Sequence, residues 1–575
     1  MLIRDYLDNI LIKTFEKLGY DTSLAHVSFS DRTDIAHLQC NGAFGLAKTL
    51  HKNPFDLATE ISEELKQQLP QFEISVVRPG FINFIIKSEF LAETAKKLIA
   101  DKRFGLPYIN KGEKVVFDYG GANIAKPLHV GHLRPAIIGE ALNSLYKLLG
   151  FDTVSDVHLG DWGLQMGLTI AQLMDDYDMS GYFEEGKPKT PITLEMLDIC
   201  YPKASARKKE DDEFNARASK ITLELQNGHK AYREMWKQIC DVSIVDCKKL
   251  YDELGAHFDL WLGESSVNEL VPHIVEDLKQ QGIAYKSEGA LVVDVADDLP
   301  PAIILKSNGA QMYAITDIAT IVDRVKKYKD LRRIIYLTDA RQGLHFKQVF
   351  TVCRKANFVD DKFNLTHIGF GTINGKDGKP FKTRDGGTVK LRSLINMVEE
   401  KAHEKLLQNN ANVDDTHRLA SQVAMAAIKY GDLSNVVSKD YIFDVDKFTS
   451  FEGKTGPYIQ YTGVRIKSLL NKANYVFSPK TFNVSINNAE TQNIMLALFK
   501  YLDSFIQSYK DNSLNSLCLE LYNLCSAFST FYNNVKILIE PDKKLRESYL
   551  NLSQLVLKAI NLGTDILGFV IPEQM

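Results

Sequence analysis

The chain has 575 residues, of which 45% are hydrophobic and 25% charged, and its formal net charge is −4. This length is too great for one hydrophobic core and predicts roughly two to four domains of ordinary globular composition. The slightly acidic balance argues against a protein that binds polyanions over its whole surface, although a local basic face would suffice for a nucleic acid.

The cysteines and the hydropathy of the sequence indicate in which cellular compartment the protein is expected. The seven cysteines are scattered and contain no C-x-x-C pair, so neither a disulfide framework nor a zinc site is indicated. The N-terminus lacks a cleavable signal layout, and no apolar run approaches the ~20 residues that span a bilayer. We therefore expect a cytoplasmic protein without a membrane partner.

Residues 1–108 predict a mixed domain of helices, short strands and a hairpin. The hairpin signal is FEISVVRPGFINFIIK, in which Pro79 and Gly80 stand at the turn between two β-rich runs. This part of the chain is therefore interpreted as an α+β N-terminal domain.

From residue 109 to 395, strand-like and helix-like patterns alternate, which is typical of a parallel sheet covered by helices. A polar, charge-rich segment at residues 175–217 interrupts the alternation and is interpreted as a surface insertion. The four expected strands are Lys114–Asp118, Thr153–Leu159, Arg333–Thr338 and Leu365–Ile373.

From residue 396 to 575 strands become scarce and helical patterns dominate, which predicts an all-α C-terminal domain. The expected helices are Asp415–Tyr430, Tyr458–Ala473, Glu490–Tyr509, Leu514–Asn534 and Lys543–Leu567. These helices carry many aromatic residues, most of which must be core, while a few could stack on the bases of single-stranded RNA.

The most informative stretch is NIAKPLHVGHLR, at residues 123–134. It follows a strand-like run and opens a helix that we expect to be amphipathic and to run to Leu149. A strand, a glycine-containing turn and a helix N-terminus form a natural phosphate site, because free N–H groups and the helix dipole point at the anion. Gly131 lets a flat ring lie against the backbone, and the imidazoles of His129 and His132 can donate to phosphate oxygens.

Two histidines at this spacing are also compatible with a metal site or with ordinary surface residues. Lys126 and Arg134 lie close to them in the sequence, so three or four potential cations surround one helix N-terminus. Such a cluster suits a polyphosphate and would repel a metal ion, and no third zinc ligand occurs at a recognised spacing. The sequence therefore predicts a nucleotide site and no protein-bound metal.

A second basic segment, GKDGKPFKTRDGG, covers residues 375–387 and follows a strand. A glycine-rich, mobile loop of this kind can close on a triphosphate and neutralise the charge that develops as pyrophosphate leaves. A solvated basic loop is the alternative. Its cations are Lys376, Lys379, Lys382 and Arg384.

At this point the chain resembles the class I aminoacyl-tRNA synthetases, in the form of the arginyl-tRNA synthetases. HVGH after NIAKPL is similar to the family's HIGH signature, and six further segments agree with the family in kind and order. One such match could arise by chance, but seven in order form a specific signal. The six segments are RPGFINF, DVHLGDWGLQMG, GAQMYAITDIAT, LTDARQGLHF, GKDGKPFKTRDGGTV and DYIFDVDKFTSFEGKTGPYIQYTGVR.

The resemblance implies an α/β fold of three domains. These are an α+β N-terminal domain at 1–108 that binds the tRNA body, and a class I Rossmann-like parallel-sheet catalytic domain at 109–395 with an insertion around 175–217. The third is an all-α anticodon-binding domain at 396–575.

The family's KMSK signature should lie in the second basic segment, but this chain has Pro380-Phe381-Lys382-Thr383 there. A subset of arginyl enzymes shares this departure, and the resemblance implies that Lys126 takes over part of the work. The implied catalytic residues are Lys126, His129, His132 and Lys382. The implied ATP-binding residues are Gly131, Lys379 and Arg384.

An arginine substrate needs a pocket that binds a guanidinium, and carboxylates in bidentate geometry read this planar cation best. Tyr313 and Asp317 stand four residues apart, on one face of a helix that begins near Ala314, and Glu264 supplies a second acid. By resemblance these three side chains contact the guanidinium, although a helix cap is the alternative for Asp317. The resemblance assigns the α-amino and carboxylate end of arginine to Asn123 and Gln342.

The segment VHLGDWG has two interpretations. Its polar and aromatic residues either build the floor of the amino-acid pocket or form a tight turn packed by the tryptophan. The residues concerned are His158, Asp161 and Trp162.

The resemblance implies an arginine–tRNA ligase that uses ATP, with Mg²⁺ bound to the ATP, and passes through an arginyl-adenylate. The expected partners are L-arginine, ATP and the arginine-accepting tRNA, and the family expectation is a monomer. Two rivals remain: another nucleotidylyltransferase with an HxGH motif, and a catalytically silent tRNA-binding paralogue. The first has no need of about 180 helical residues after its sheet, and the intact HVGH and pocket residues argue against the second.

Overall fold

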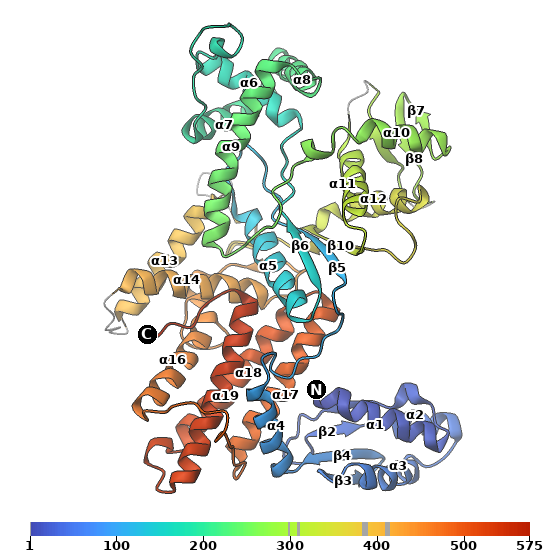
Figure 1. Cartoon of the computed structure of the whole chain (residues 1–575), viewed down its shortest axis with the longest axis vertical. Coiled ribbons are helices and arrows are strands. Elements are labelled where there is room, and N and C mark those ends of the chain that lie inside the picture. The colour runs from blue at the N-terminus through green and yellow to red at the C-terminus, as the bar shows by residue number, and fades with distance from the viewer. Residues whose placement is uncertain (1, 297–298, 308–310, 382–388, 409–414) are drawn as a thin grey trace. The chain divides into compact units, whose positions relative to one another are not determined.

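The computed structural model describes residues 2–296, 299–307, 311–381, 389–408 and 415–575. The chain forms two compact units (Figure 1). One contains the residues up to 109 together with 401–434 and 446–575, and the other contains 110–400 and 435–445.

The N-terminal part of the first unit is an antiparallel sheet of four strands in the order β1-β2-β4-β3, covered by helices. The predicted hairpin is confirmed, with Val77 paired to Phe81 across the Pro79–Gly80 turn. The elements are α1 (Ile3–Leu18), β1 (Val27–Phe29), β2 (Leu38–Cys40), α2 (Gly42–Leu50), α3 (Pro54–Gln68), β3 (Phe72–Val77), β4 (Phe81–Ile86) and α4 (Ser88–Ala100).

The rest of the first unit is helical, as the periodicity of the sequence predicts. Lys558 joins the two parts, because its ammonium donates to the carbonyls of Ile99 and Asp101 after α4, at 2.7 and 2.8 Å. The helices are α14 (Thr416–Leu433), α16 (Gly456–Lys472), α17 (Ala489–Asp511), α18 (Asn515–Asn534) and α19 (Lys543–Leu567).

The second unit is built around a four-stranded parallel sheet in the order β11-β10-β5-β6. Strand β5 pairs with β6 on one side and with β10, which comes later in the chain, on the other side. The crevice beyond the carboxyl ends of β5 and β10 is therefore a topological switch point, where α/β sheets bind ligands. The strands are β5 (Lys114–Asp118), β6 (Asp152–Asp156), β10 (Leu331–Asp339) and β11 (Asn364–Phe370).

Helices and two small β elements surround this sheet. Figure 1 shows α6–α9 as one helical group and α10–α12 with β7–β9 as another, and β12 pairs in parallel with β13. The segment predicted as an insertion, 175–217, lies largely within the first group. The elements are α5 (Leu133–Leu148), α6 (Leu164–Asp176), α7 (Leu194–Glu210), α8 (Asp212–Gln226), α9 (Lys230–Glu253), α10 (Val271–Gln280), β7 (Ala284–Ser287), β8 (Ala290–Val293), β9 (Ala302–Leu305), α11 (Tyr313–Lys327), α12 (Gly343–Lys355), β12 (Ile373–Asn374) and β13 (Tyr441–Ile442), with α13 (Leu391–Gln408) and α15 (Val445–Phe448) where the chain passes between units.

The helix after NIAKPLHVGHLR differs from the sequence prediction in two ways. It begins only at Leu133, after a 3₁₀ turn at Val130–His132, and it is buried on nearly all sides instead of being amphipathic. Arg134 explains part of this burial, because its guanidinium donates to the carbonyls of Gly371 and Lys439 at 2.8 and 3.0 Å. Segments from beyond the sheet therefore cover the face of α5 that was expected to meet water.

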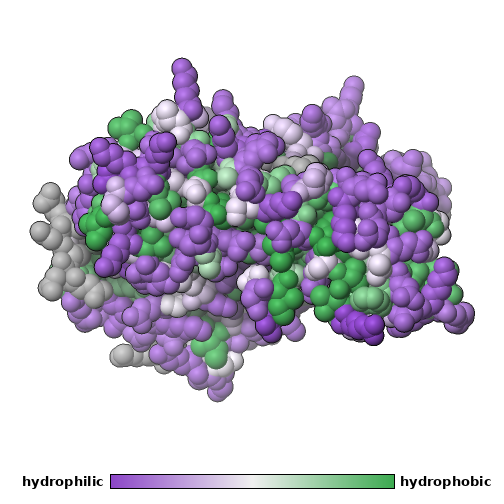
Figure 2. Space-filling view, turned by 90° about the horizontal axis from the view of Figure 1, so that it is seen from below, coloured by the Kyte–Doolittle hydropathy of each residue, from purple (hydrophilic) through white to green (hydrophobic). Residues whose placement is uncertain are grey.

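The described surface has no membrane-spanning signature. Among the residues in the five described ranges, no helix is both long and apolar enough to cross a bilayer. Figure 2 shows one face of the molecule, on which hydrophilic side chains predominate and apolar groups are scattered.

One buried ion cluster holds the sheet to α11. The guanidinium of Arg324 bridges the carboxylates of Asp118, at the end of β5, and Asp156, at the end of β6, at 2.6 and 2.7 Å. It also donates to the hydroxyl of Tyr336 on β10 at 3.2 Å, and all four residues are buried. One side chain thus links three adjacent strands to a helix.

We predict that Arg324→Met destabilises the fold strongly, because it leaves two carboxylates buried without their cation. The free energy of unfolding should fall by about 3–5 kcal/mol, which urea denaturation followed by circular dichroism would measure. The matched control is Arg332→Met, which removes an exposed arginine on β10, four residues before Tyr336, and should change stability by less than about 0.5 kcal/mol. Equal unfolding midpoints for the two variants would contradict the prediction.

Candidate active site

Two cavities lie beyond the carboxyl ends of β5, β6 and β10. One has a volume of about 380 Å³ and is lined by the HVGH segment, and the other has about 440 Å³ and is lined by acidic residues. The two cavities share four lining residues and are therefore adjacent, so one ligand could extend from the first cavity into the second. The shared residues are Gly121, Asn123, Thr338 and Gln342.

In the first cavity, the two histidines of HVGH hold each other in place. The Nδ1 atom of His129 accepts from the backbone N–H of Gly131, and the Nδ1 atom of His132 accepts from the backbone N–H of His129, both at 3.1 Å. An Nδ1 atom that accepts carries no proton, so in the neutral ring the proton is on Nε2. Each imidazole therefore keeps one N–H donor for a ligand.

Burial decides the charge of these rings. It lowers the pKa of His129 to about 4, with a further contribution from the nearby Lys126 ammonium. It also holds the pKa of His132 well below the ordinary value, and the same ammonium contributes. Without a bound anion both histidines are neutral donors near pH 7, which corrects the sequence-based view of a cluster of cations.

Two glycines, one in the wall of each cavity, are needed for close contacts with neighbouring side chains. A Cβ on Gly131 would lie 2.8 Å from Cε1 of His129, so the imidazole can contact the backbone at position 131 only if that residue has no side chain. A Cβ on Gly160 would lie 2.4 Å from Oδ1 of Asn123. The predicted contact of a flat ring with Gly131 is thus made by the chain's own histidine.

The basic residues predicted for the first cavity are distributed unevenly. Pro380 and Phe381 line it, and Lys379 is exposed beside them, while Lys382 and Arg384 fall outside the described residues. Lys126 lines a neighbouring small cavity with Asp198 and Asp246, and burial lowers the pKa of its ammonium.

The second cavity gathers the predicted guanidinium-binding residues. Asp317 and Tyr313 lie on the first turns of α11, Glu264 lies on a 3₁₀ turn, and all three line the cavity, with Tyr313 largely exposed at 64%. The common face expected for Tyr313 and Asp317 is therefore present. Asn123 and Gln342 line both cavities, between the acids and the HVGH segment.

Two histidines flank the carboxylate of Asp317. Nε2 of His345 lies 2.5 Å from its Oδ2 atom, and Nε2 of His158 lies 4.0 Å from Oδ1. In the described part of the chain neither ring nitrogen of His158 has a hydrogen-bond partner, and its φ of 42° is strained. One oxygen of Asp317 is thus held by the protein and the other faces the cavity.

Glu264 is the acid whose charge depends most on what the cavity contains. Burial raises its pKa to about 7, and the carboxylates of Asp317 and Asp161 contribute, while His158 opposes them. A cation in the cavity would favour the charged form and lower this pKa.

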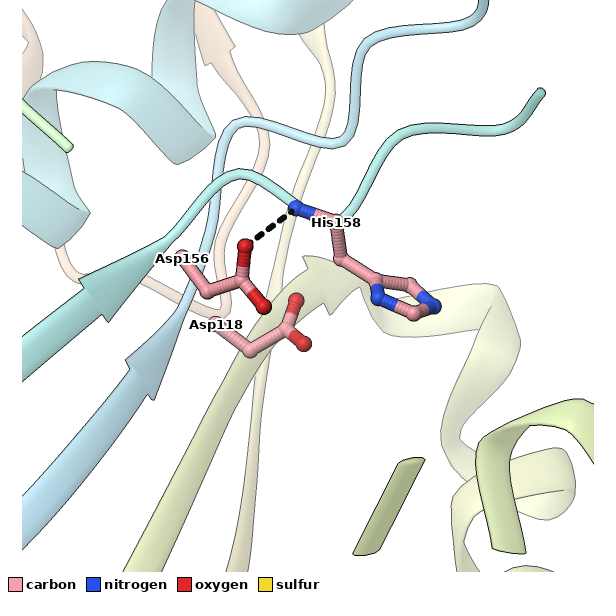
Figure 3. Close-up of side chains that lie close together, drawn as sticks. All are labelled: Asp118, Asp156 and His158. Carbon is pink, nitrogen blue, oxygen red and sulfur yellow. Dashed lines mark hydrogen bonds between the residues drawn. The ribbon is translucent and has the colours of Figure 1, made fainter. Parts of the chain in front are cut away.

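The carboxylates nearest the sheet are not free to bind a ligand. Figure 3 shows Asp118, Asp156 and His158 close together, with the backbone N–H of His158 donating to Asp156 at 3.3 Å. Among the described residues this is the one cluster with a spacing that suits a metal ion, but the Arg324 guanidinium already bridges its two carboxylates.

Part of the VHLGDWG segment has a packing role. Asp161 accepts from the backbone and hydroxyl of Ser265, and Trp162 is buried against Trp236 and donates to Asn268 at 3.1 Å. Of the three residues singled out in this segment, only His158 lines the cavity.

Sequence reasoning missed His345 and Arg324. His345 lies in the segment LTDARQGLHF, three residues after Gln342, and this spacing at the start of a helix was the available signal. Arg324 reads as an ordinary cation near the C-terminal end of α11, and only the sheet topology brings it to the two aspartates.

A parallel sheet with a switch-point crevice, an HVGH turn after its first strand and a helical domain after the sheet define a class I tRNA synthetase. Sequence profiles agree: tRNA synthetases class I (R), catalytic domain, matches 94–445, the arginyl tRNA synthetase N terminal domain matches 1–86, and the DALR anticodon binding domain matches 459–575.

Comparison with individual proteins shows to which family within this class the chain belongs. The chain is 44% identical to an arginine–tRNA ligase of Agathobacter rectalis, over 98% of both chains. It is 40% identical to one of Alkaliphilus oremlandii, over 98% of this chain and 97% of that one. The crystal structure of arginyl-tRNA synthetase from Plasmodium falciparum matches with a TM-score of 0.84 and 26% identity, covering 100% of this chain and 99% of that one. The chain belongs to the arginine–tRNA ligase family.

We predict that binding of free L-arginine strengthens as the pH rises through about 7. Glu264 is protonated in the empty cavity below its pKa of about 7, so a guanidinium must displace that proton, and binding releases it. The dissociation constant should fall roughly five- to tenfold between pH 6 and pH 8, the change expected for about one pKa unit of coupling.

Calorimetry at pH 6, 7 and 8, in buffers of different ionisation enthalpy, measures both the affinity and the proton release. Glu264→Gln should flatten the dependence, whereas Glu269→Gln, an exposed glutamate on the same segment, should preserve it. A flat profile for the unmodified protein would mean that Glu264 is already ionised in the empty cavity.

Proposed function

We propose that this chain attaches L-arginine to its cognate tRNA and consumes ATP in doing so. Formation of an arginyl-adenylate releases pyrophosphate, and transfer of the arginyl group to tRNA then releases AMP. The observation that carries the proposal is the pair of cavities with a shared wall. An acidic cavity suited to a guanidinium adjoins one lined by the HVGH turn, so both substrates of adenylate formation can meet at Asn123 and Gln342.

In the acidic cavity, Asp317 and Glu264 bind the guanidinium and the hydroxyl of Tyr313 closes its outer side. Two carboxylates around one planar cation give the bidentate geometry that lysine cannot satisfy. Asn123 and Gln342 hold the α-amino and carboxylate groups, which directs the carboxylate toward the first cavity.

In the first step, a carboxylate oxygen of arginine attacks the α-phosphorus of ATP, and the bond to pyrophosphate breaks. The Nε2–H groups of His129 and His132 donate to phosphate oxygens as charge develops, and Gly131, the backbone position assigned to ATP, lets the His129 ring lie against the chain there. Catalysis is therefore positioning and electrostatic stabilisation, without a covalent enzyme intermediate. The cations assigned to the phosphates are Lys126, Lys379, Lys382 and Arg384.

Mg²⁺ is proposed to arrive with the ATP and to be held chiefly by its phosphates, as is usual for this ion. The nearest carboxylate pair, Asp118 and Asp156, is bridged by Arg324 and is not assigned to it. In the second step the 2′-hydroxyl of the terminal tRNA ribose attacks the adenylate carbonyl, and AMP leaves.

The three domains of the proposal are residues 1–108 for the tRNA body, 109–395 for catalysis with an insertion around 175–217, and 396–575 for the anticodon. Within the last, the exposed Tyr461 and the half-buried Tyr532 are the aromatic side chains we assign to unstacked bases. Arg465 lies over both rings, at 4.7 and 5.2 Å, and supplies a cation beside them. We further propose that the protein acts as a monomer and is located in the cytoplasm.

The direct test is transfer of labelled arginine to bulk tRNA by the purified full-length protein, with the Asp317→Asn variant beside it. The variant should fold normally and lose about 2–4 kcal/mol of guanidinium recognition, roughly 30- to 1000-fold in kcat/KM for arginine. Asp323→Asn, on the same helix but outside the cavity, is the matched control.

A near-normal KM for arginine in Asp317→Asn would reduce Asp317 to a structural partner of His345. The helix cap that the sequence left open does not apply, because α11 begins at Tyr313 with Met312 as its N-cap. Absence of charging by the unmodified protein, with adenylate formed on another acid, would favour the nucleotidylyltransferase alternative. Absence of both reactions, with tRNA still bound, would favour the silent paralogue.

We also predict that arginine-dependent pyrophosphate exchange requires tRNA. The segment that replaces KMSK lacks the usual lysine pair and lies partly outside the described residues. We expect its remaining cations to act on the phosphates only when the acceptor end is bound, a switch driven by the second substrate. Exchange with arginine, ATP and Mg²⁺ should be near background without tRNA and should appear when cognate tRNA is added. Vigorous exchange without tRNA would refute the coupling and leave the ligase proposal intact.

A further inference from the structure

The turn that carries Lys126 has an unusual backbone. Ala125 has a φ of 64°, in the left-handed region that residues with a Cβ adopt at a cost in conformational energy. It is also buried, at 3% exposure, so water does not stabilise its backbone. Such a conformation persists only where the surrounding structure holds it.

A serine on α9 holds this backbone conformation. The Oγ atom of Ser243, in the middle of α9, accepts from the backbone N–H of Ala125 at 3.1 Å. Ser243 is itself buried, at 5% exposure, and the two residues are 118 positions apart in the sequence. Lys126 lines the small cavity next to this bond together with Ser243 and Asp246, so α9 packs against the turn over more than one residue.

The residues on either side of Ala125 are fixed independently of α9. The backbone N–H of Ile124 donates to Gly160 at 3.1 Å, which ties the Asn123 end of the turn to the segment after β6. On the other side, Pro127 confines Lys126 to an extended backbone. The direction in which the Lys126 side chain leaves the chain therefore depends on the conformation at Ala125.

We infer that Ser243 is a positioning residue for Lys126: its hydroxyl holds the left-handed turn at Ala125 and thereby aims the lysine at the phosphates of ATP. The inference rests on the proposed function, because it requires Lys126 to act on ATP. It assigns part of the phosphate chemistry to α9, a helix that follows the insertion and contributes no residue to the lining of the two large cavities.

The test uses the full-length protein with tRNA, and measures kcat and KM for pyrophosphate exchange together with thermal unfolding. Ser243→Ala should lower kcat by about three- to tenfold, the range expected for one buried neutral hydrogen bond, with the KM for arginine and the melting temperature nearly unchanged. Cys247→Ala, one turn along the same face of α9, is the matched control and should keep kcat.

Two double variants separate positioning from general packing. Adding Ala125→Gly to Ser243→Ala should restore at least half of the lost kcat, because glycine adopts a positive φ without the cost of a Cβ. In a Lys126→Ala background, Ser243→Ala should have no further effect on kcat.

The inference is overturned if the losses from Ser243→Ala and Lys126→Ala multiply, if glycine at position 125 gives no recovery, or if the KM for arginine rises with the fall in kcat. Failure of the proposed function looks different, since the unmodified protein would then show no arginine-dependent exchange even with tRNA.

Discussion

The buried guanidinium of Arg324 is the constraint on which the rest of the site depends. It joins the carboxyl ends of β5 and β6 to α11, and α11 begins with Tyr313 and carries Asp317. Loss of this cation would leave two carboxylates in a low-dielectric interior, so strands and helix cannot separate without a large electrostatic cost. The inner wall of the acidic cavity is therefore rigid, and it supports the two carboxylates that face the cavity, Asp317 and Glu264.

The same pair of aspartates limits the negative charge that the acidic cavity presents to cations. Asp118 and Asp156 are saturated from within by the chain's own guanidinium, and one oxygen of Asp317 is occupied by His345. Glu264 is only partly ionised near pH 7 in the empty cavity, because burial raises its pKa to about 7. The empty cavity thus presents a reduced negative charge, and full attraction develops only for a cation that reaches both remaining acids.

Several elements were predictable because their signals are local. The strand Lys114–Asp118 and the helix Lys543–Leu567 have the bounds that the sequence predicts, since a short apolar run after a turn and a long periodic segment leave little ambiguity. The five predicted residues around the acidic cavity do come together there, while their individual roles remain predictions. Motif order supplied the fold class of all three parts, which the profile matches and related structures confirm.

Other features depend on contacts that no local pattern encodes. The helix after HVGH starts only at Leu133 because a 3₁₀ turn at Val130–His132 precedes it, and this turn does not follow from helical periodicity. The burial of α5 depends on Gly371 and Lys439, more than 200 residues away. The charge of the histidines was misjudged for the same reason, because desolvation is a property of the folded chain.

The reciprocal hydrogen bonds of His129 and His132 have a consequence for how this turn can vary. Each ring caps a backbone N–H that lies at or beside the other histidine, so removal of one ring loosens the backbone that orients the other. The two positions are then a single cooperative unit, and their replacements are expected to be strongly non-additive. Replacement of one histidine alone would also impair the other, whereas replacement of both together would cost little more than replacement of one. Selection on this turn therefore acts on the two histidines as a pair.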